Sequence, residues 1–173
     1  MKKIFAAHAF RNALPLAFLL STVFIQLPLQ ARPIKRHDKV TPQQVKVFLV
    51  ALGDNGKIGK KFGCEDSLVP VKRTLKPTRS PLKAAIQQLL AIPPDYPENP
   101  QLKNFWKGRN LQLKSVSLRR GIATIVFSGE IFVAGICDEP RIIEQIEATA
   151  RQFASVKKVK VLVNSRTLAE VIR

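Results

Sequence analysis

Two segments of this chain each carry a single apolar stripe at helical spacing, and this pair of stripes limits the possible fold more than any other feature. The first segment runs from Ser80 to Ala91, and the second begins at Asp138. The apolar positions are Leu82, Ala85, Ile86, Leu89 and Leu90 in the first, and Ile142, Ile146, Ala150 and Phe153 in the second. A helix with one apolar stripe must bury that stripe against a second layer of structure. Ser80 and Asp138 are both of the residue types that cap helices, so we expect each to cap its helix.

Two extended segments near the start of the chain can supply part of that second layer. Val45–Ala51 alternates apolar and polar side chains, as in a half-buried strand. Ser67–Leu75 also has an extended pattern, but it contains Pro70, which cannot donate a hydrogen bond to a neighbouring strand. We therefore expect this second segment to lie at an edge of a sheet.

A hairpin is predicted over residues 111–128. Gly121 occupies the second turn position, where a tight turn needs a positive φ. The apolar pattern of the first hairpin strand changes phase between Leu113 and Val116, which indicates a β-bulge. Before the hairpin, a Pro- and Asn-rich loop holds Tyr96, Phe105 and Trp106. We expect these aromatic side chains to pin the loop to the core, although a ligand platform is the alternative.

The end of the chain supplies one more strand and a short helix. Lys157–Asn164 alternates inward valines with outward lysines, and Thr167–Arg173 has a helical pattern. The resulting order is β-β-α-β-β-α-β. It predicts an α+β fold, a two-layer sandwich in which one mixed or antiparallel sheet is covered by two helices.

The N-terminus has the features of a secretory signal peptide. An apolar run, Ala13–Leu29, follows three basic residues and precedes a small residue, Ala31, at the expected cleavage position. A membrane span needs about 20 apolar residues, and this run is shorter and is interrupted by prolines. We therefore expect cleavage after Ala31 rather than an uncleaved anchor. The predicted divisions are a signal peptide at 1–31, a flexible lead-in at 32–44 and one domain at 45–173.

The charge of the chain is strongly positive. The 29 Lys and Arg residues outnumber the 12 Asp and Glu residues, which gives a formal net charge of +17. Cleavage after Ala31 removes Lys2, Lys3 and Arg11, so the mature chain has 26 basic against 12 acidic residues, or +14. Such an excess predicts attraction to anionic surfaces. Nucleic acid is not an expected partner, because the chain lacks a recognition motif and is predicted to be exported to the periplasm, the cell envelope or the medium.

The two cysteines, Cys64 and Cys137, both follow the signal peptide. An even number of cysteines in an exported chain favours a disulfide. A metal pair or a reactive thiol is the alternative, but zinc usually takes four ligands and no histidine lies nearby. A bridge over this separation restricts the unfolded chain by about 4 kcal/mol. The loop Gly53–Gly63 lacks the later acidic ligands of a calcium site, so the sequence predicts neither a metal nor a cofactor.

Four stretches of the chain, taken in order, carry a family resemblance. They are VKVFLVALGDNGKIGKKFGCEDSLVPV from Val45, Arg73-Thr74 with Ser80-Pro81-Leu82 and the helix AAIQQLLA, the hairpin SVSLRRGIATIVFSGEI, and FASVKKVKVLV from Phe153. Together they resemble the GerM-type (GerMN) sporulation and spore germination domain over about residues 45–171. The resemblance implies an extracytoplasmic, non-catalytic domain, and a disulfide between GCEDSLVPV and GICDEPR. The best-known members have two such domains in tandem and a lipobox cysteine, whereas this chain has one domain and no such cysteine.

Catalysis is not expected. The mature chain keeps a single histidine, His37, in the lead-in, so a Ser-His-Asp or Cys-His site lacks a well-placed base. The four acids beside the cysteines, Glu65, Asp66, Asp138 and Glu139, are the alternative, because a disulfide brings them close and paired carboxylates can hydrolyse glycosides. The more ordinary interpretation is that they cap a helix and begin a turn.

The basic residues suggest a docking function. The candidates for contact with an anionic surface are Lys57, Lys60, Lys61, Lys72, Arg73, Lys76 and Arg79. A solvated basic face is the alternative. The sequence thus predicts a non-enzymatic envelope protein that binds another envelope protein or itself, with the Ser67–Leu75 edge as the contact. The second hypothesis is a basic module that binds an anionic envelope polymer or a membrane surface.

Overall fold

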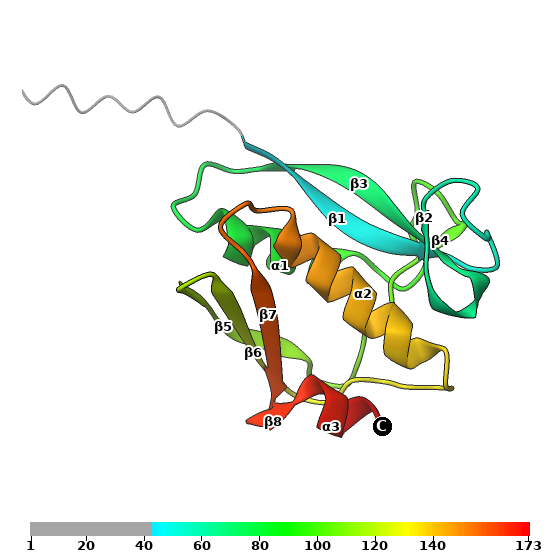
Figure 1. Cartoon of the computed structure of the whole chain (residues 1–173). Helices are drawn as coiled ribbons and strands as arrows, with labels where there is room; N and C mark the ends of the chain where they lie inside the picture. The colour runs from blue at the N-terminus through cyan, green and yellow to red at the C-terminus, as the bar shows by residue number, and fades with distance from the viewer. Residues whose placement is uncertain (1–42) are drawn as a thin grey trace, which may run out of the picture. The chain divides into compact units, whose positions relative to one another are not determined.

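The computed structural model describes residues 43–173, which form two sheets and three α-helices (Figure 1). The predicted signal peptide, its cleavage site after Ala31 and lead-in residues 32–42 lie outside the described residues. The strands are β1 Gln43–Ala51, β2 Lys60–Lys61, β3 Ser67–Leu75, β4 Leu102–Lys103, β5 Gln112–Arg119, β6 Ile122–Ser128, β7 Lys158–Val163 and β8 Arg166–Thr167. The helices are α1 Pro81–Ala91, α2 Asp138–Arg151 and α3 Leu168–Ile172, with a short 3-10 turn, η1, at Gly63–Glu65.

The predicted α+β class is confirmed, and the long elements match their predicted positions closely. The first strand begins at Gln43, two residues before the predicted start. The predicted hairpin bulge is present, because the β5–β6 register shifts between Leu113 and Ser115. The short C-terminal helix is also present, and it begins with a capping box in which Thr167 and Glu170 bond each other.

The strands form two four-stranded sheets, where the sequence predicted one. Sheet A has the order β2-β3-β1-β4, and sheet B has the order β5-β6-β7-β8. In sheet B, β6 and β7 run parallel and are joined by α2, as in a β-α-β unit, while every other pairing in the two sheets is antiparallel. Helices α1 and α2 contact strands of both sheets, so they form a layer between them (Figure 1).

The outer edge of β1 explains why the sheets stay separate. Strand β4 pairs with β1 only at Val50 and Ala51. Nearer the start of β1, the backbone N–H of Phe48 donates to Thr149 Oγ1 at 3.2 Å, and the backbone carbonyl of Phe48 accepts from Gln145 Nε2 at 2.9 Å. A strand whose exposed N–H and C=O groups already have partners cannot pair with another strand there. Side chains of α2 therefore take the place that a strand of sheet B would need.

The same arrangement continues one turn further along α2. The N–H of Lys46 donates to Gln152 Oε1 at 2.7 Å, and Gln152 Nε2 donates to the Lys46 carbonyl at 2.6 Å. Thus Gln145, Thr149 and Gln152, which follow one another at helical spacing, act as a polar ladder along β1. We call these three residues the polar stripe of α2.

The prediction that Ser67–Leu75 lies at a sheet edge is correct for most of this strand, but not for the two residues that pair with β2. Strand β2 pairs with β3 only at Ser67 and Leu68, so the rest of β3 has an unpaired outer edge among the described residues. Pro70 lies opposite Phe48, whose backbone groups point to α2. The missing N–H of Pro70 therefore removes no hydrogen bond between β1 and β3.

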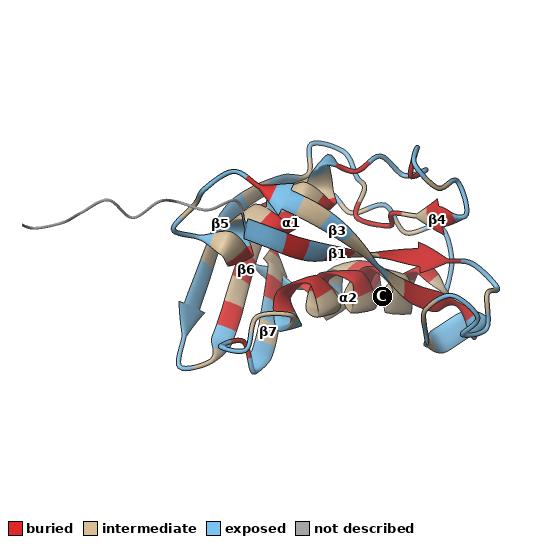
Figure 2. Cartoon of the chain, turned by 90° about the horizontal axis from the view of Figure 1, so that it is seen from above, coloured by how far each residue is buried: buried red, intermediate tan, exposed pale blue. Residues whose placement is uncertain are grey.

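The core lies where the helix layer meets the two sheets (Figure 2). Buried positions alternate along β6 at Ala123, Ile125 and Phe127, as the sequence predicted. Tyr96, Phe105 and Trp106 are all buried, so the aromatic residues do pin the loop to the core. Trp106 stacks on Phe127 with ring centroids 4.8 Å apart, and its indole N–H donates to the Ile142 carbonyl at 2.8 Å.

A buried polar group joins the loop to both helices. Asn104 donates from Nδ2 to the carbonyls of Leu89 and Ile92 at the C-terminal end of α1, where the Leu89 carbonyl also accepts the Ile92 N–H. Gln145, fully buried, accepts the Phe105 N–H at 2.8 Å and also approaches Asn104 Oδ1. Because each of these groups is buried, each must find a hydrogen-bond partner, and this requirement fixes the mutual positions of α1, α2 and β1.

The predicted roles of Ser80 and Asp138 as caps need correction. Ser80 is the N-cap residue of α1, but its hydroxyl makes no capping bond. The N-cap of α2 is Cys137, one residue before the predicted position. Asp138 is instead the first helical residue, and its carboxylate is drawn away to the Ala134 N–H and to Arg141.

The polar stripe generates a stability prediction. Replacing Gln145 by Leu leaves the Phe48 carbonyl and the Phe105 N–H buried without partners, and each such group costs about 1–3 kcal/mol. We expect the Gln145→Leu variant to lose about 3 kcal/mol of unfolding free energy. Urea unfolding followed by the fluorescence of Trp106 measures this. The control is Gln87→Leu on the exposed side of α1, and an equal effect in both variants contradicts the assigned role.

Candidate functional site

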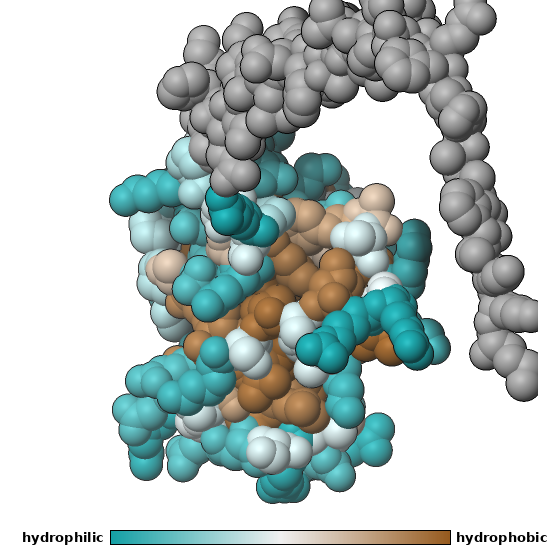
Figure 3. Space-filling view, turned by 90° about the vertical axis from the view of Figure 1, so that its left-hand side faces the viewer, coloured by the Kyte–Doolittle hydropathy of each residue, from teal (hydrophilic) through white to brown (hydrophobic). Residues whose placement is uncertain are grey.

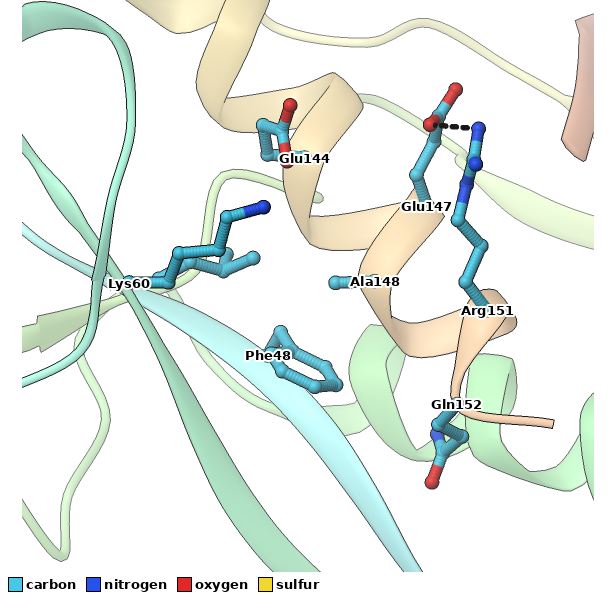
Figure 4. A pocket seen from close by; sticks show the side chains of 8 residues that line it. Phe48, Lys60, Glu144, Glu147, Ala148, Arg151 and Gln152 are labelled. Carbon is cyan, nitrogen blue, oxygen red and sulfur yellow. Dashed lines mark hydrogen bonds and ion pairs between the residues drawn. The ribbon is translucent and has the colours of Figure 1, made fainter. Parts of the chain in front are cut away.

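A hollow on the described surface lies between the outer face of sheet A and α2 (Figure 4). Its volume is about 480 Å³. The Phe48 ring from β1 faces Ala148 of α2, and Lys60 of β2 extends toward the helix. The other residues that line it are Leu68, Glu144, Glu147, Arg151 and Gln152.

A second hollow of about 310 Å³ continues the first along the same face. The two share Phe48 and Gln152. The second adds Gln44, Val45, Lys46 and Lys72 from β1 and β3. Together the two hollows make one groove, which we call the sheet A groove. Its position follows from the polar stripe, because the stripe holds α2 beside β1 and so builds the wall.

The charges in the sheet A groove are of both signs. Lys46 and Lys72 occupy one end, and Lys60 extends toward Glu144 at the other (Figure 4). Glu147 accepts a 2.8 Å hydrogen bond from Arg151 on the next helical turn. A groove with an apolar floor and charged groups of both signs suits a protein segment, because the side chains of a protein can offer apolar contact and charges of both signs together.

The seven basic residues predicted to meet an anionic surface lie in different places. Lys60 and Lys72 line the sheet A groove. Lys57, Lys61 and Lys76 are exposed outside it. Arg79 lines a different hollow at the start of α1. The structure thus places two of the seven in the sheet A groove, one in each of its two hollows, and their binding role stays a prediction.

Arg73, the remaining member of that set, faces inward from β3. Its guanidinium lies 5.2 Å from the centre of the Tyr96 ring and bonds Glu98 at 3.0 Å. Tyr96 also donates its hydroxyl to Glu98. Burial raises the pKa of Tyr96, and the bond to Glu98 adds to this rise. The bonds from Tyr96 and then from Arg73 hold the pKa of Glu98 below its usual value. Arg73 is therefore a structural cation that fastens the loop after α1.

Cys64 and Cys137 form the predicted disulfide, which joins η1 to the start of α2. Cys64 and Glu65 both have positive φ, 58° and 57°, a conformation that residues other than glycine rarely adopt. The buried side chain of Asp66 helps to hold this turn, because Asp66 Oδ1 accepts the Gly53 N–H at 2.9 Å. The bridge thus fixes the loop that carries β2 and Lys60 against α2.

The disulfide brings acidic residues close together, as the hydrolase hypothesis required, but an arginine lies between them. Arg141 bonds Asp66 at 2.6 Å and Asp138 at 3.2 Å. Burial lowers the pKa of Arg141, and the bonds and charges of Asp66 and Asp138 outweigh this and raise it. Asp66 is only 1% exposed. The two carboxylates therefore bind an internal cation and do not face a cleft.

Within residues 43–173, no cluster of three or more His, Cys, Asp or Glu side chains is placed to hold a metal ion. None of the helices in that part of the chain is long and apolar enough to cross a membrane.

Sequence reasoning did not find three residues that shape the sheet A groove: Lys46, Phe48 and Glu144. Each lies on a polar or mixed face of its element and resembles an ordinary surface residue. The polar stripe of α2 does have a sequence signal. Its residues are uncharged and lie directly beside the apolar stripe, whereas Glu144, Glu147 and Arg151 on the neighbouring side of the helix are charged.

The disulfide generates the next prediction. The bridge closes a loop of 73 residues, which the loop-entropy model converts to about 4 kcal/mol of stability. We expect the Cys64→Ser, Cys137→Ser double variant to lose most of this amount in urea unfolding. A reducing agent should destabilise the unmodified protein equally and leave the double variant unchanged. Equal stability of the oxidised and reduced forms contradicts the prediction.

Comparisons with known proteins agree with this architecture. A family model for "Germane: Sporulation and spore germination" matches residues 52–169. Among solved structures, the first GerMN domain of the sporulation protein GerM from Bacillus subtilis is similar, with a TM-score of 0.53 and 22% identity over 75% of this chain and 88% of that one. The tandem GerMN domains of the same protein give a TM-score of 0.54 and 22% identity, over 76% of this chain and 42% of that one. No curated protein sequence matches.

At 22% identity the two solved structures support the fold alone. The family model spans more than half of the chain, and the matched region holds the disulfide, both long helices, sheet B and all of sheet A except β1. The chain therefore belongs to the Germane family of sporulation and spore germination domains.

Proposed function

We propose that this chain is an exported, non-enzymatic envelope protein whose domain binds another envelope protein in the sheet A groove. The observation that carries the proposal is the groove itself, an apolar floor at Phe48 flanked by charged groups of both signs. Membership of the Germane family and the disulfide support export, since disulfides persist in oxidising compartments.

The structure of the acidic cluster supports a binding role over a hydrolytic one. Glycoside hydrolysis needs two carboxyl groups that flank a substrate bond. Asp66 and Asp138 are both buried and bonded to Arg141. Moving either carboxylate to a substrate breaks an internal ion pair and leaves a buried charge uncompensated. These internal ion pairs fix the start of α2, which favours a structural role for Asp66 and Asp138.

The partner is best described as a protein segment. Lys46, Lys60 and Lys72 can pair with acidic side chains, and Glu144 with a basic one. The free outer edge of β3 lies beside the groove and includes Lys72. A segment that carries both signs of charge can satisfy these groups together, whereas an anionic polymer satisfies only the lysines.

The anionic polymer is nevertheless a second candidate, because the exposed surface holds lysines both inside and outside the groove. The two candidates differ in which lysine matters. Lys60 lines the groove, and its neighbour Lys61 is exposed outside it. The pair of variants Lys60→Glu and Lys61→Glu thus makes the same charge change at adjacent positions.

A photo-crosslinking experiment tests the proposal. A photoreactive residue at Ala148, on the groove wall, is placed in the mature protein, residues 32–173, and the crosslinked partner is isolated from the native envelope. We expect Lys60→Glu to reduce the yield of crosslinked partner at least tenfold, because the variant loses a charge pair that the partner buries in the groove. Lys61→Glu should have little effect on this yield. Equal loss in both variants, together with salt-sensitive binding to isolated wall polymer, contradicts the protein-segment proposal and favours the polymer.

A further inference from the structure

A second surface, remote from the sheet A groove, combines positive charge with exposed apolar side chains. It lies at the β5–β6 turn, where α1 begins and where the chain passes from α2 to β7 (Figure 1). We call it the hairpin end. Its basic residues are Arg79, Lys83, Arg119, Arg120, Lys157 and Lys158. None of these six forms an ion pair with another residue in the range 43–173.

The hairpin end contains no acid. The three stretches that build it, 67–94, 99–129 and 148–169, lack Asp and Glu altogether. They meet in space, because the Gly121 carbonyl accepts the N–H groups of Lys157 and Lys158. Arg79 and Lys83 line the same hollow as Leu118. The positive potentials of the six side chains therefore add up at the hairpin end, which makes it complementary to a surface of high negative charge density.

Apolar side chains lie among these cations. A hollow of about 230 Å³ is lined by Leu82, Val116, Leu118 and Phe153, with Arg79 and Lys83 at its margin. On this side of the molecule, Figure 3 shows an apolar surface surrounded by hydrophilic residues. An anionic polysaccharide gains nothing from contact with such a surface, whereas a lipid does.

The turn of the hairpin carries one exposed apolar side chain on each of its faces. Leu118 is 40% exposed and lies opposite the buried Ala123, so both point to the helix side of sheet B. Ile122 is 42% exposed, and as the neighbour of Ala123 along the strand it points to the opposite side. A rigid protein surface contacts one face of a hairpin, but a fluid bilayer surrounds its tip and contacts both.

The chain also enters the domain near this end. Val45, close to the start of β1, packs with Leu75 and Phe153, and Phe153 lines the hairpin-end hollow. The first described strand therefore begins beside the hairpin end.

We propose that the hairpin end docks on the surface of an anionic phospholipid bilayer, with the β5–β6 turn inserted among the headgroups. Arg119 and Arg120 pair with lipid phosphates, and Leu118 and Ile122 enter the boundary of the acyl chains. The proposal rests on export but not on a protein partner, since it uses a surface separate from the sheet A groove. A second copy is the weaker occupant, because the mature chain is strongly positive and copies of it repel each other.

Brominated phospholipid vesicles test the insertion. In the mature protein with Ile122→Trp, the added indole should be quenched by phosphatidylglycerol vesicles that contain brominated acyl chains, while the buried Trp106 provides a constant background. The matched control is Ile58→Trp, a similarly exposed site at 48% in the loop before β2. Quenching at position 58 and not at position 122 overturns the proposal. The proposal is also overturned if the protein dimerises without lipid and the dimer buries the indole at position 122.

Charge variants complete the test. In vesicle co-sedimentation, the double variant Arg119→Gln, Arg120→Gln should bind phosphatidylglycerol vesicles about thirtyfold more weakly than the unmodified mature protein does. Each basic residue lost from the hairpin end should weaken binding roughly fivefold. Lys57→Gln with Lys61→Gln, the same charge loss elsewhere, should change it less than fivefold. Equal effects, or equal binding to neutral phosphatidylcholine vesicles, contradict specific docking. The double arginine variant should keep the Ala148 crosslink, so failure here is separable from failure of the groove.

Discussion

The arrangement of this domain depends on how α2 satisfies the free edge of β1. An unpaired strand edge exposes N–H and C=O groups that must find partners. Here Gln145, Thr149 and Gln152 supply those partners from a helix, at the backbone of Lys46 and Phe48. Because a helix closes the edge at these positions, β4 pairs with β1 only at Val50 and Ala51, and the remaining long strands form a separate sheet on the other side of the helix layer.

That one constraint also accounts for the position of the sheet A groove. The polar stripe fixes the side of α2 that meets β1, and the charged residues beside it, Glu144 and Glu147, then face the outer surface of sheet A. The disulfide and the Asp66–Arg141 ion pair fix the other end of the helix. These contacts therefore hold α2 against sheet A at both ends of the groove and along its length. A binding site needs this rigidity, because its charged side chains must stay aligned with those of the partner.

Local patterns predicted the elements well because each is governed by neighbours along the chain. The stripes of α1 and α2, the alternation of β1 and β6, the β5 bulge and the position of Pro70 at an edge all follow from period and backbone chemistry. The number of sheets did not follow, since it depends on side-chain hydrogen bonds between residues about 100 positions apart, such as Gln145 with Phe48. The predicted cap of α2 is wrong by one residue, because the Asp138 carboxylate bonds the Ala134 N–H and Arg141 and does not cap the helix.

The candidate site was less predictable than the fold. The basic residues were visible in the sequence, but their grouping was not, because Arg73 turns inward to Tyr96 and Arg79 lies at the hairpin end. The acidic partners in the groove come from α2, far along the chain. Charge composition therefore indicated a docking protein, and only the tertiary structure separated a mixed-charge groove from a purely cationic apolar end.

Amide hydrogen exchange at Lys46 and Phe48 tests the central claim most directly. Both N–H groups point away from β3 and donate to side chains of α2. If the polar stripe closes the edge, both amides exchange slowly in the native protein, Phe48 more slowly than Lys46, and Thr149→Ala with Gln152→Ala releases them while the amides that pair with β3 stay protected. Rapid exchange of both amides in the unmodified protein, with the rest of β1 protected, would show that this edge is open and that α2 does not close it.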